Sequence, residues 1–318
     1  MSASAGPVKK TMRDTFIGEV LKAMDAGENI FFLSADFGAP ALDDLRARHP
    51  DRFINVGIAE QNLINVATGL GLEGYTVYAY AIAPFVTMRC YEQIRVNLAI
   101  LSQLRPMNVN LVGVGAGFSY EVSGPTHHCL EDISIMRTLP NFEVISPSDY
   151  ITAGTLFRYT TSHVGPKYLR FDAKPVAAIH ESVSAADLER GFIEIKKGQG
   201  TCIVATGFMT HKAVEVMHQL ESREARAGLI DMIKIKGFNE AQLVQALKGY
   251  KKVITLEEGF IGKGGLDAAI CSVIHQHDIP VKFKAMGLKD HYHFHIGSRD
   301  SLHARDGLDN ESITNAAL

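Results

Sequence analysis

The sequence predicts an α/β protein of two domains, each a mostly parallel sheet flanked by helices. Short apolar runs alternate with longer segments in which apolar residues recur at helical spacing. This alternation is typical of parallel strands buried between two layers of helices. A polar, acidic stretch interrupts the alternation once, at residues 173–190, after which it resumes. We therefore predict a first domain at residues 1–172, a linker at 173–190 and a second domain at 191–318.

The first domain is predicted to begin with a helix, because the apolar residues between Phe16 and Met24 recur at helical spacing and Gly27 can end it. Further helices are expected at residues 58–72, after Pro84, which suits a first helical turn, and from a Ser148 cap to about residue 161. The predicted strands of this domain are 29–34, 53–56, 75–80, 108–112, 142–145 and 167–171.

The second domain repeats the alternation on a smaller scale. Its predicted strands are 201–205, 227–232, 252–256 and 280–285. Its predicted helices are 211–220, 239–247 and a segment after Gly264.

Composition excludes several classes of protein. The 318 residues are 46% hydrophobic, which is enough for a sizeable core, and a net charge of −3 gives no reason to expect binding to nucleic acid or to a membrane surface. No stretch approaches the roughly 20 apolar residues of a membrane span. The four cysteines are scattered and form no CxxC pair. We therefore expect a soluble protein of the reducing cytoplasm, with its thiols packed as small hydrophobic groups.

Chemistry in open α/β sheets collects at the carboxyl ends of the strands, and Glu60 lies in such a place. It follows a strand and stands in the first turns of an apolar helix, where the helix dipole favours a carboxylate. By itself this position favours a capping acid on a solvated face. The alternative is a buried acid hydrogen-bonded to a heterocyclic nitrogen, a bond worth roughly 1.5–3 kcal/mol.

Three strings decide between these interpretations: NVGIAEQN at 55–62, YAYAIAPFVTMRCYEQIR at 78–95 and GPTHHCLEDISIMRTLPNFEVISPSD at 124–149. Together they resemble the pyrimidine-binding half of transketolases and deoxyxylulose-phosphate synthases, and the resemblance runs from about Arg13 to the C-terminus. It implies thiamine diphosphate as cofactor and identifies Glu60 with the glutamate that activates thiamine through a hydrogen bond to its aminopyrimidine ring.

The same resemblance assigns roles to other side chains. Phe85 stands where the family stacks an aromatic ring on the aminopyrimidine, a contact worth roughly 0.5–1.5 kcal/mol. Ile82 and Met88 stand where many transketolases carry further aromatic residues of this pocket, so the pocket is expected to be apolar but less aromatic. His127 matches the histidine that hydrogen-bonds the donor's hydroxyl groups and helps to move protons. The alternative for Phe85 is an ordinary core phenylalanine, and the alternative for His127 is a loop histidine without a special role.

The expected substrate site departs from the family pattern. Arg13 and Arg170 match arginines that bind the sugar phosphate, for which a guanidinium fork is suited, although a surface ion pair is the alternative for each. Pro40 replaces the serine that supports this phosphate, so a different anion is possible. Ser123 replaces an aspartate that reads a donor hydroxyl, and a second histidine is replaced at about Gly115. These departures predict an atypical, for example branched, ketose donor.

The resemblance also implies a partner. The family binds the diphosphate and Mg²⁺ with a GDG…N segment of another domain, and no GDG segment occurs in this chain. Because the match begins close to residue 1, we expect that domain on a separate N-terminal transketolase subunit, in an α2β2 heterotetramer with active sites between the chains. The expected reaction is transfer of a two-carbon ketol unit from a ketose to an aldose.

Three other functions stay open: the beta subunit of a 2-oxoacid dehydrogenase, a split deoxyxylulose-phosphate synthase, and a catalytically dead homologue that only scaffolds a partner. No metal site is predicted within the chain. Adjacent His128 and Cys129 rarely converge on one ion, and for the alternating histidines at 291, 293 and 295 a solvated tail or a subunit contact is favoured over a metal site.

Overall fold

The computed structural model describes residues 8–318, and it confirms the α/β fold class. Residues 1–7, the start of the predicted first domain, lie outside the described part. The first sheet has seven strands in the order β12-β6-β7-β5-β4-β2-β3, all parallel except for β12, which is antiparallel to β6. Its strands are β2 (Ile30–Ser34), β3 (Phe53–Asn55), β4 (Thr76–Ile82), β5 (Asn108–Val114), β6 (Glu143–Ile145), β7 (Lys167–Phe171) and β12 (Lys234–Lys236).

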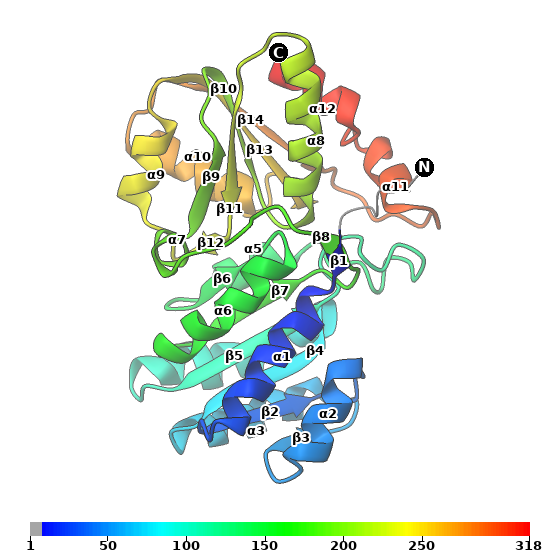
Figure 1. Ribbon diagram of the computed structural model, residues 1–318, viewed down its shortest axis with the longest axis vertical. Coiled ribbons are helices and arrows are strands. Elements are labelled where there is room, and N and C mark those ends of the chain that lie inside the picture. Colours follow the sequence, from blue (N-terminus) through cyan, green and yellow to red (C-terminus); the bar gives the residue numbers. More distant parts are fainter. Residues whose placement is uncertain (1–7) are drawn as a thin grey trace, which may run out of the picture.

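Helices cover both faces of this sheet. Helices α1 (Met12–Asp25), α2 (Pro40–Arg48) and α6 (Tyr150–Ser162) pack on the face turned to the viewer in Figure 1. Helix α3 (Glu60–Leu72), the helical segment 85–103 and α5 (Asp132–Arg137) pack on the other. The helix predicted after Pro84 is not regular, because it consists of π-helical turns at Phe85–Arg89 and Ile94–Ile100, the short α4 (Tyr91–Gln93) between them and a 3₁₀ turn at Leu101–Gln103.

The second sheet has five strands in the order β14-β13-β10-β11-β9, with β9 antiparallel to β11 and the other pairs parallel. Its strands are β9 (Phe192–Lys196), β10 (Gly200–Ala205), β11 (Gly228–Met232), β13 (Tyr250–Phe260) and β14 (Lys282–Leu288). The helices after β8 in the sequence are α7 (Ala185–Arg190), α8 (Phe208–Ser222), α9 (Glu240–Leu247), α10 (Leu266–Gln276), α11 (Arg299–Arg305) and α12 (Asn310–Ala317).

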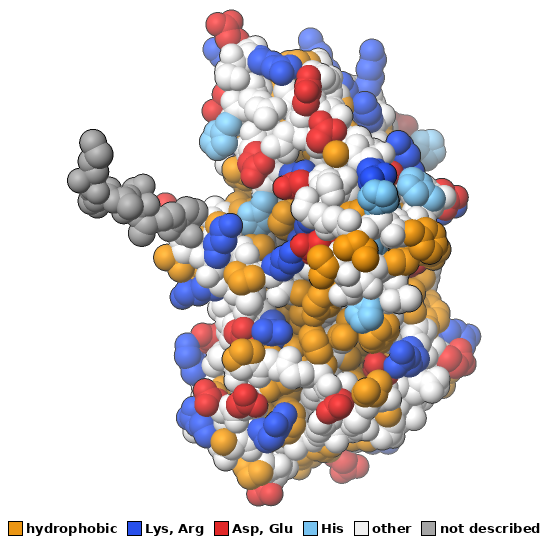
Figure 2. Space-filling model, turned by 90° about the vertical axis from the view of Figure 1, so that its right-hand side faces the viewer, with side chains coloured by type: hydrophobic (Ala, Val, Ile, Leu, Met, Phe, Trp, Pro, Cys, Tyr) orange, Lys and Arg blue, Asp and Glu red, His pale blue; other side chains and the backbone are white. Residues whose placement is uncertain are grey.

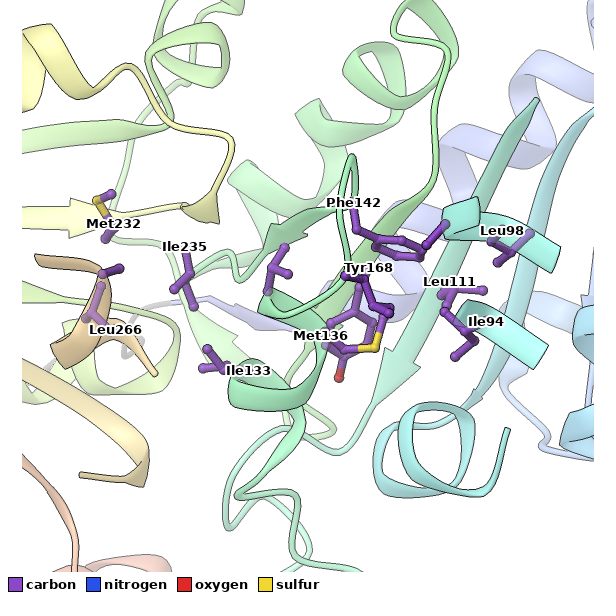
Figure 3. Packing of buried hydrophobic residues seen from close by; sticks show 14 of the residues in the cluster. Ile94, Leu98, Leu111, Ile133, Met136, Phe142, Tyr168, Met232, Ile235 and Leu266 are labelled. Carbon is purple, nitrogen blue, oxygen red and sulfur yellow. The ribbon is translucent and has the colours of Figure 1, made fainter. Parts of the chain in front are cut away.

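The two halves share a strand and a core. Strand β12 follows β11 of the second sheet but pairs with β6 of the first. Figure 3 shows buried side chains of one continuous cluster, from Leu98 and Leu111 on one face of the first sheet, through Met136, to Ile235 on β12 and Leu266 on α10. Because apolar burial is the main source of folding free energy, the halves are expected to unfold together.

Some predicted elements differ in the structure. Asp149, not Ser148, caps α6, because its side chain accepts a hydrogen bond of 2.8 Å from the backbone N–H of Thr152. The acidic stretch at 173–190 contains β8 (Val176–Ala177), paired with β1 (Lys9–Lys10), and the capped helix α7.

No helix within residues 8–318 combines the length and the hydrophobicity that a membrane crossing requires.

Candidate functional site

Glu60 is the first residue of α3, directly after β3 and the turn at Gly57. It is 2% exposed although it carries a carboxylate. Its Oε2 accepts a hydrogen bond of 2.6 Å from Nη1 of Arg89, and within residues 8–318 its Oε1 accepts none. The positive end of the α3 dipole and the Arg89 guanidinium both attract the carboxylate, which offsets part of the cost of its burial. The acid is therefore held in a fixed place with one oxygen left for another donor.

Phe85 and Arg89 lie four residues apart on the segment that follows β4. The guanidinium carbon of Arg89 lies 4.8 Å from the centroid of the Phe85 ring, a cation–π contact. Arg89 was not predicted from the sequence. Its spacing of four from Phe85 was the available signal, because residues four apart share one face of a helix.

His127 completes a chain of contacts with these residues. Its ring lies edge-on to Phe85, with centroids 5.3 Å apart and planes at 70°. Its Nδ1 lies 3.0 Å from the hydroxyl of Thr126, and its backbone N–H donates to the carbonyl of Gly124. The structure thus brings together Glu60, Phe85 and His127, which come from the carboxyl ends of three different strands, as the sequence predicts for an α/β site.

Ile82 and Met88 flank Phe85 in the sequence. Ile82 ends β4 and is half-buried, whereas Met88 lies in the π-helical turn and is 39% exposed. Neither side chain offers a hydrogen-bonding group to the site.

Arg13 lies on α1 beside two tyrosines. It makes a two-pronged contact with Asp14, at 3.0 and 3.1 Å. Burial raises the phenol pKa values of Tyr80 and Tyr120, and the nearby Arg13 guanidinium acts in the opposite direction on both. Tyr120 lies 6.4 Å from His127, ring centroid to ring centroid, so Arg13 belongs to the same region as the predicted catalytic histidine.

The loop after β5 explains one departure from the family pattern. Gly115 has φ +109°, and a Cβ there would lie 2.3 Å from Cε2 of Tyr120. The Tyr120 ring therefore occupies the space that a side chain at position 115 would need. Ser123 is exposed in this loop, and its backbone N–H donates to the carbonyl of Tyr120. Pro40 is the first residue of α2, a position where a missing N–H costs nothing.

Arg170 is not brought to this site. It is 3% exposed, its Nε donates to Asp132 at 2.7 Å, and its Nη2 donates to the carbonyls of Cys129 and Glu258. These contacts tie β7 to α5 and to β13, which is a structural role rather than that of a substrate ligand. An exposed cation near the end of β7 is Lys174, whose side chain pairs with Glu121 in the loop before His127. Lys174 was likewise not predicted from the sequence.

The remaining histidine motifs lie elsewhere. His128 is buried, its two ring nitrogens have no hydrogen-bond partner in residues 8–318, and burial lowers its pKa. The three alternating histidines lie in the loop after β14, not on a strand. Of these, His293 is buried against Asp306, whereas His291 and His295 are exposed.

Known domain families match the chain over nearly its whole length. The transketolase pyrimidine-binding domain matches residues 8–175, and the transketolase C-terminal domain matches residues 192–313. These matches confirm the resemblance that the three sequence strings indicate.

Related proteins give the same result. The chain is 32% identical to one of the subunits of apulose-4-phosphate transketolase from Actinobacillus succinogenes, over 85% of either chain. It is 32% identical to a putative transketolase C-terminal section of Methanocaldococcus jannaschii, over 96% of this chain and 95% of that one. Among solved structures, a split-gene transketolase described as an inactive β4 tetramer superposes with a TM-score of 0.83, at 27% identity, over 96% of this chain and 97% of that one.

Proposed function

Because this chain belongs to the transketolase family, we propose that it is the subunit of a two-chain, thiamine diphosphate-dependent transketolase that activates the cofactor, with Glu60 as the activating acid. The observation that carries the proposal is the burial of Glu60 at a helix N-terminus, with one oxygen free and the Phe85 and His127 rings close by.

The residues present fit the pyrimidine half of the cofactor. A flat, apolar ring system suits the Phe85 side chain and the apolar Ile82 and Met88, and a ring nitrogen that carries a proton suits a buried carboxylate oxygen. When bound, thiamine diphosphate supplies the nucleophilic carbon and the electron sink for carbon–carbon cleavage. Glu60 holds the proton at the pyrimidine nitrogen, and Phe85 orients the ring and excludes water.

His127 and Arg13 act on the sugar in this proposal. His127 hydrogen-bonds a donor hydroxyl and moves a proton at that oxygen, and Arg13 binds the distal anion through its guanidinium. We leave Arg170 out of the substrate site because its contacts are with Asp132 and two carbonyls. The reaction shortens a ketose by a two-carbon ketol unit and lengthens an aldose by the same unit.

In this proposal the partner subunit supplies the site that binds the diphosphate group of the cofactor and Mg²⁺. Mg²⁺ prefers oxygen ligands in octahedral geometry. Within residues 8–318, one group of potential metal ligands lies close enough together to share an ion: His291, His293 and Asp306. Two imidazoles and one carboxylate do not form the oxygen-rich set that Mg²⁺ prefers. We therefore propose an α2β2 heterotetramer in which the charged half of the cofactor is held by an N-terminal transketolase subunit.

The donor in this proposal is a branched or otherwise atypical ketose that carries a distal anion. Ser123 and Gly115 replace two side chains that read the common donors, and the Tyr120 ring fills the space beside Gly115. A relative that is 32% identical over 270 aligned residues is an apulose-4-phosphate transketolase subunit, which supports a donor outside the common sugar phosphates.

The test is reconstitution with an N-terminal transketolase subunit of the same genome. The purified pair is assayed with a panel of ketose phosphates and with pyruvate, with and without thiamine diphosphate and Mg²⁺. We expect ketol transfer only when both chains and both cofactors are present. Decarboxylation of pyruvate without ketol transfer would instead support the 2-oxoacid dehydrogenase or deoxyxylulose-phosphate synthase alternative, and turnover by this chain alone would remove the need for a partner.

A further inference from the structure

Three metal-binding side chains converge where the loop at residues 289–298, after β14, meets the end of α11. Nε2 of His293 lies 2.7 Å from Oδ2 of Asp306, and Nε2 of His291 lies 3.7 Å from Oδ1 of the same carboxylate. One ligand atom from each residue can be chosen so that all three lie within 4.8 Å of one another. The two imidazole rings are 4.8 Å apart, centroid to centroid.

The carboxylate at the centre of this group is buried and only half used. The side chain of Asp306 is fully buried, and its Oδ1 accepts no hydrogen bond within residues 8–318. An unpartnered carboxylate oxygen in the interior costs free energy, because it has lost its hydration without gaining a donor. The structure therefore contains an acceptor that a cation bound beside His291 would satisfy.

The surroundings fix two of the three side chains and leave the third open to solvent. His293 is 3% exposed in its side chain and packs edge-on against Phe118, with ring centroids 5.1 Å apart. Asp306 caps α11, and its backbone N–H donates to the carbonyl of His303. The side chain of His291 is 52% exposed, so an ion has a path of entry. Figure 2, seen from the side where α11 lies in Figure 1, shows histidine side chains beside a group of hydrophobic ones.

The chemistry of this donor set selects the ion. Zinc sites that keep an open position use three protein ligands, such as two histidines and a carboxylate, at about 2.0–2.2 Å from the metal. Ligand atoms around a tetrahedral ion at such distances are about 3.3 Å apart. Here His293 makes a hydrogen bond of 2.7 Å to Oδ2 of Asp306, His291 lies 3.7 Å from Oδ1, and one ligand atom from each residue lies within 4.8 Å of the others, so an ion would replace the hydrogen bond and draw the three side chains together. Mg²⁺ and Ca²⁺ prefer oxygen ligands and are disfavoured here.

We propose that His291, His293 and Asp306 form a Zn²⁺ site that fastens the loop at 289–298 to the end of α11, with a water molecule in the fourth position. This loop carries three exposed apolar side chains, Tyr292, Phe294 and Ile296. Its buried end rests on Phe118, in the loop that also carries the predicted catalytic His127. Zinc would order an apolar surface beside the loop of the active site.

The test uses the full chain without an affinity tag, treated with EDTA and dialysed, in the absence of thiamine diphosphate. Zinc content is measured by mass spectrometry after incubation with ZnCl₂, and affinity is measured by competition with a chromophoric chelator. His291→Ala is the main variant, because its exposed side chain can be removed without a cavity. Asp306→Asn tests the buried ligand. His295→Ala is the matched control, since His295 is an exposed histidine of the same loop outside the cluster.

We expect one zinc per wild-type chain, at least a tenfold loss of affinity in His291→Ala and in Asp306→Asn, and no change in His295→Ala. A zinc-dependent rise in melting temperature is expected in the wild type and in the His295→Ala control, but not in His291→Ala. Sub-stoichiometric zinc in the wild type, or equal affinity of His291→Ala and His295→Ala, would overturn the site. Neither outcome depends on catalysis, so the proposed function is tested separately.

Discussion

Nη1 of Arg89 donates a hydrogen bond of 2.6 Å to the buried carboxylate of Glu60, while the same guanidinium lies over the Phe85 ring at 4.8 Å. A flat cation thus contacts both the acid and the aromatic ring of the proposed pyrimidine site. Arg89 thus pairs with the carboxylate of Glu60 and covers part of the Phe85 ring in this chain.

The variant Arg89→Ala tests this relationship. Removal of one partner from a fully buried ion pair costs about 3–5 kcal/mol, but the side chain of Arg89 is 45% exposed, so we expect a loss of about 1–2 kcal/mol in the free energy of unfolding. Urea denaturation measures it. Arg95→Ala is the control, since Arg95 lies on the same segment and its Nη1 is 3.7 Å from Oε1 of Glu92, in an ion pair whose two side chains are both exposed. Equal stability of the two variants would show that Arg89 does not compensate the acid.

The variant Glu60→Gln keeps the shape of the side chain and removes its charge. We expect ketol transfer by the reconstituted pair, and proton exchange at the thiazolium carbon, to fall by at least about 100-fold, because general acid–base contributions are of that size or larger. Glu73→Gln, an exposed glutamate at the end of α3, serves as control. Wild-type exchange rates in Glu60→Gln would remove Glu60 from the mechanism.

The variant Arg170→Ala is expected to act on stability rather than on substrate affinity. It would leave Asp132, which is fully buried, without its cationic partner, at a cost of about 3–5 kcal/mol in the free energy of unfolding. Lys174→Ala, which removes a half-exposed cation, should change stability by less than about 0.5 kcal/mol. A stable Arg170→Ala chain that showed only a raised KM would restore Arg170 to the substrate site.

The variant Ser123→Asp is expected to shift donor preference toward common sugar phosphates. A carboxylate at this exposed position can accept a hydrogen bond from a donor hydroxyl, and a bond of about 1.4 kcal/mol corresponds to about tenfold in kcat/KM. The ratio of kcat/KM between donors is compared with that of Ser123→Ala, which adds no acceptor. An unchanged donor profile would contradict our interpretation of this loop.

Stability is expected to depend on pH through Glu257. Burial raises its pKa to about 7, although the backbone N–H groups of Leu266 and Asp267 donate to it. The folded chain therefore binds a proton more tightly than the unfolded chain, for which the pKa is 4.5. The stabilisation is complete below pH 4.5 and is lost as pH rises to about 7.

The measurement is the slope of unfolding free energy against pH between 5 and 8, in the wild type and in Glu257→Gln. We expect the glutamine variant to lose the part of this decline that belongs to Glu257, about 3 kcal/mol at most. Its absolute stability is not the readout, since the two backbone N–H groups donate to different oxygens of Glu257 and glutamine keeps only one oxygen. Parallel slopes would show that Glu257 does not titrate in this range.

Periodicity in the sequence predicts most strands of the fold but not its interruptions. The apolar runs at 108–112 and 167–171 correspond to β5 and β7, because a strand buried on both faces must be apolar throughout. The short strand β12 was missed, since three residues contain no period and its partner β6 is 89 residues earlier, as Lys234 pairs with Ile145. Helices α11 and α12 were missed because they span only seven and eight residues, which is short for a helical period to be recognised.

The sequence by itself determined the family, the fold class and the positions of Glu60, Phe85 and His127 after three strands. It could do so because local apolar patterns and motifs indicate which segments are buried and in which order strands and helices follow. Only the tertiary structure decided which cation meets which acid. Arg89 pairs with Glu60, 29 positions away in the sequence, and Arg170 pairs with Asp132, 38 positions away. As a result Arg89 lies in the candidate site, whereas Arg170 lies outside it. Local sequence cannot specify such pairs, because they depend on how distant elements pack.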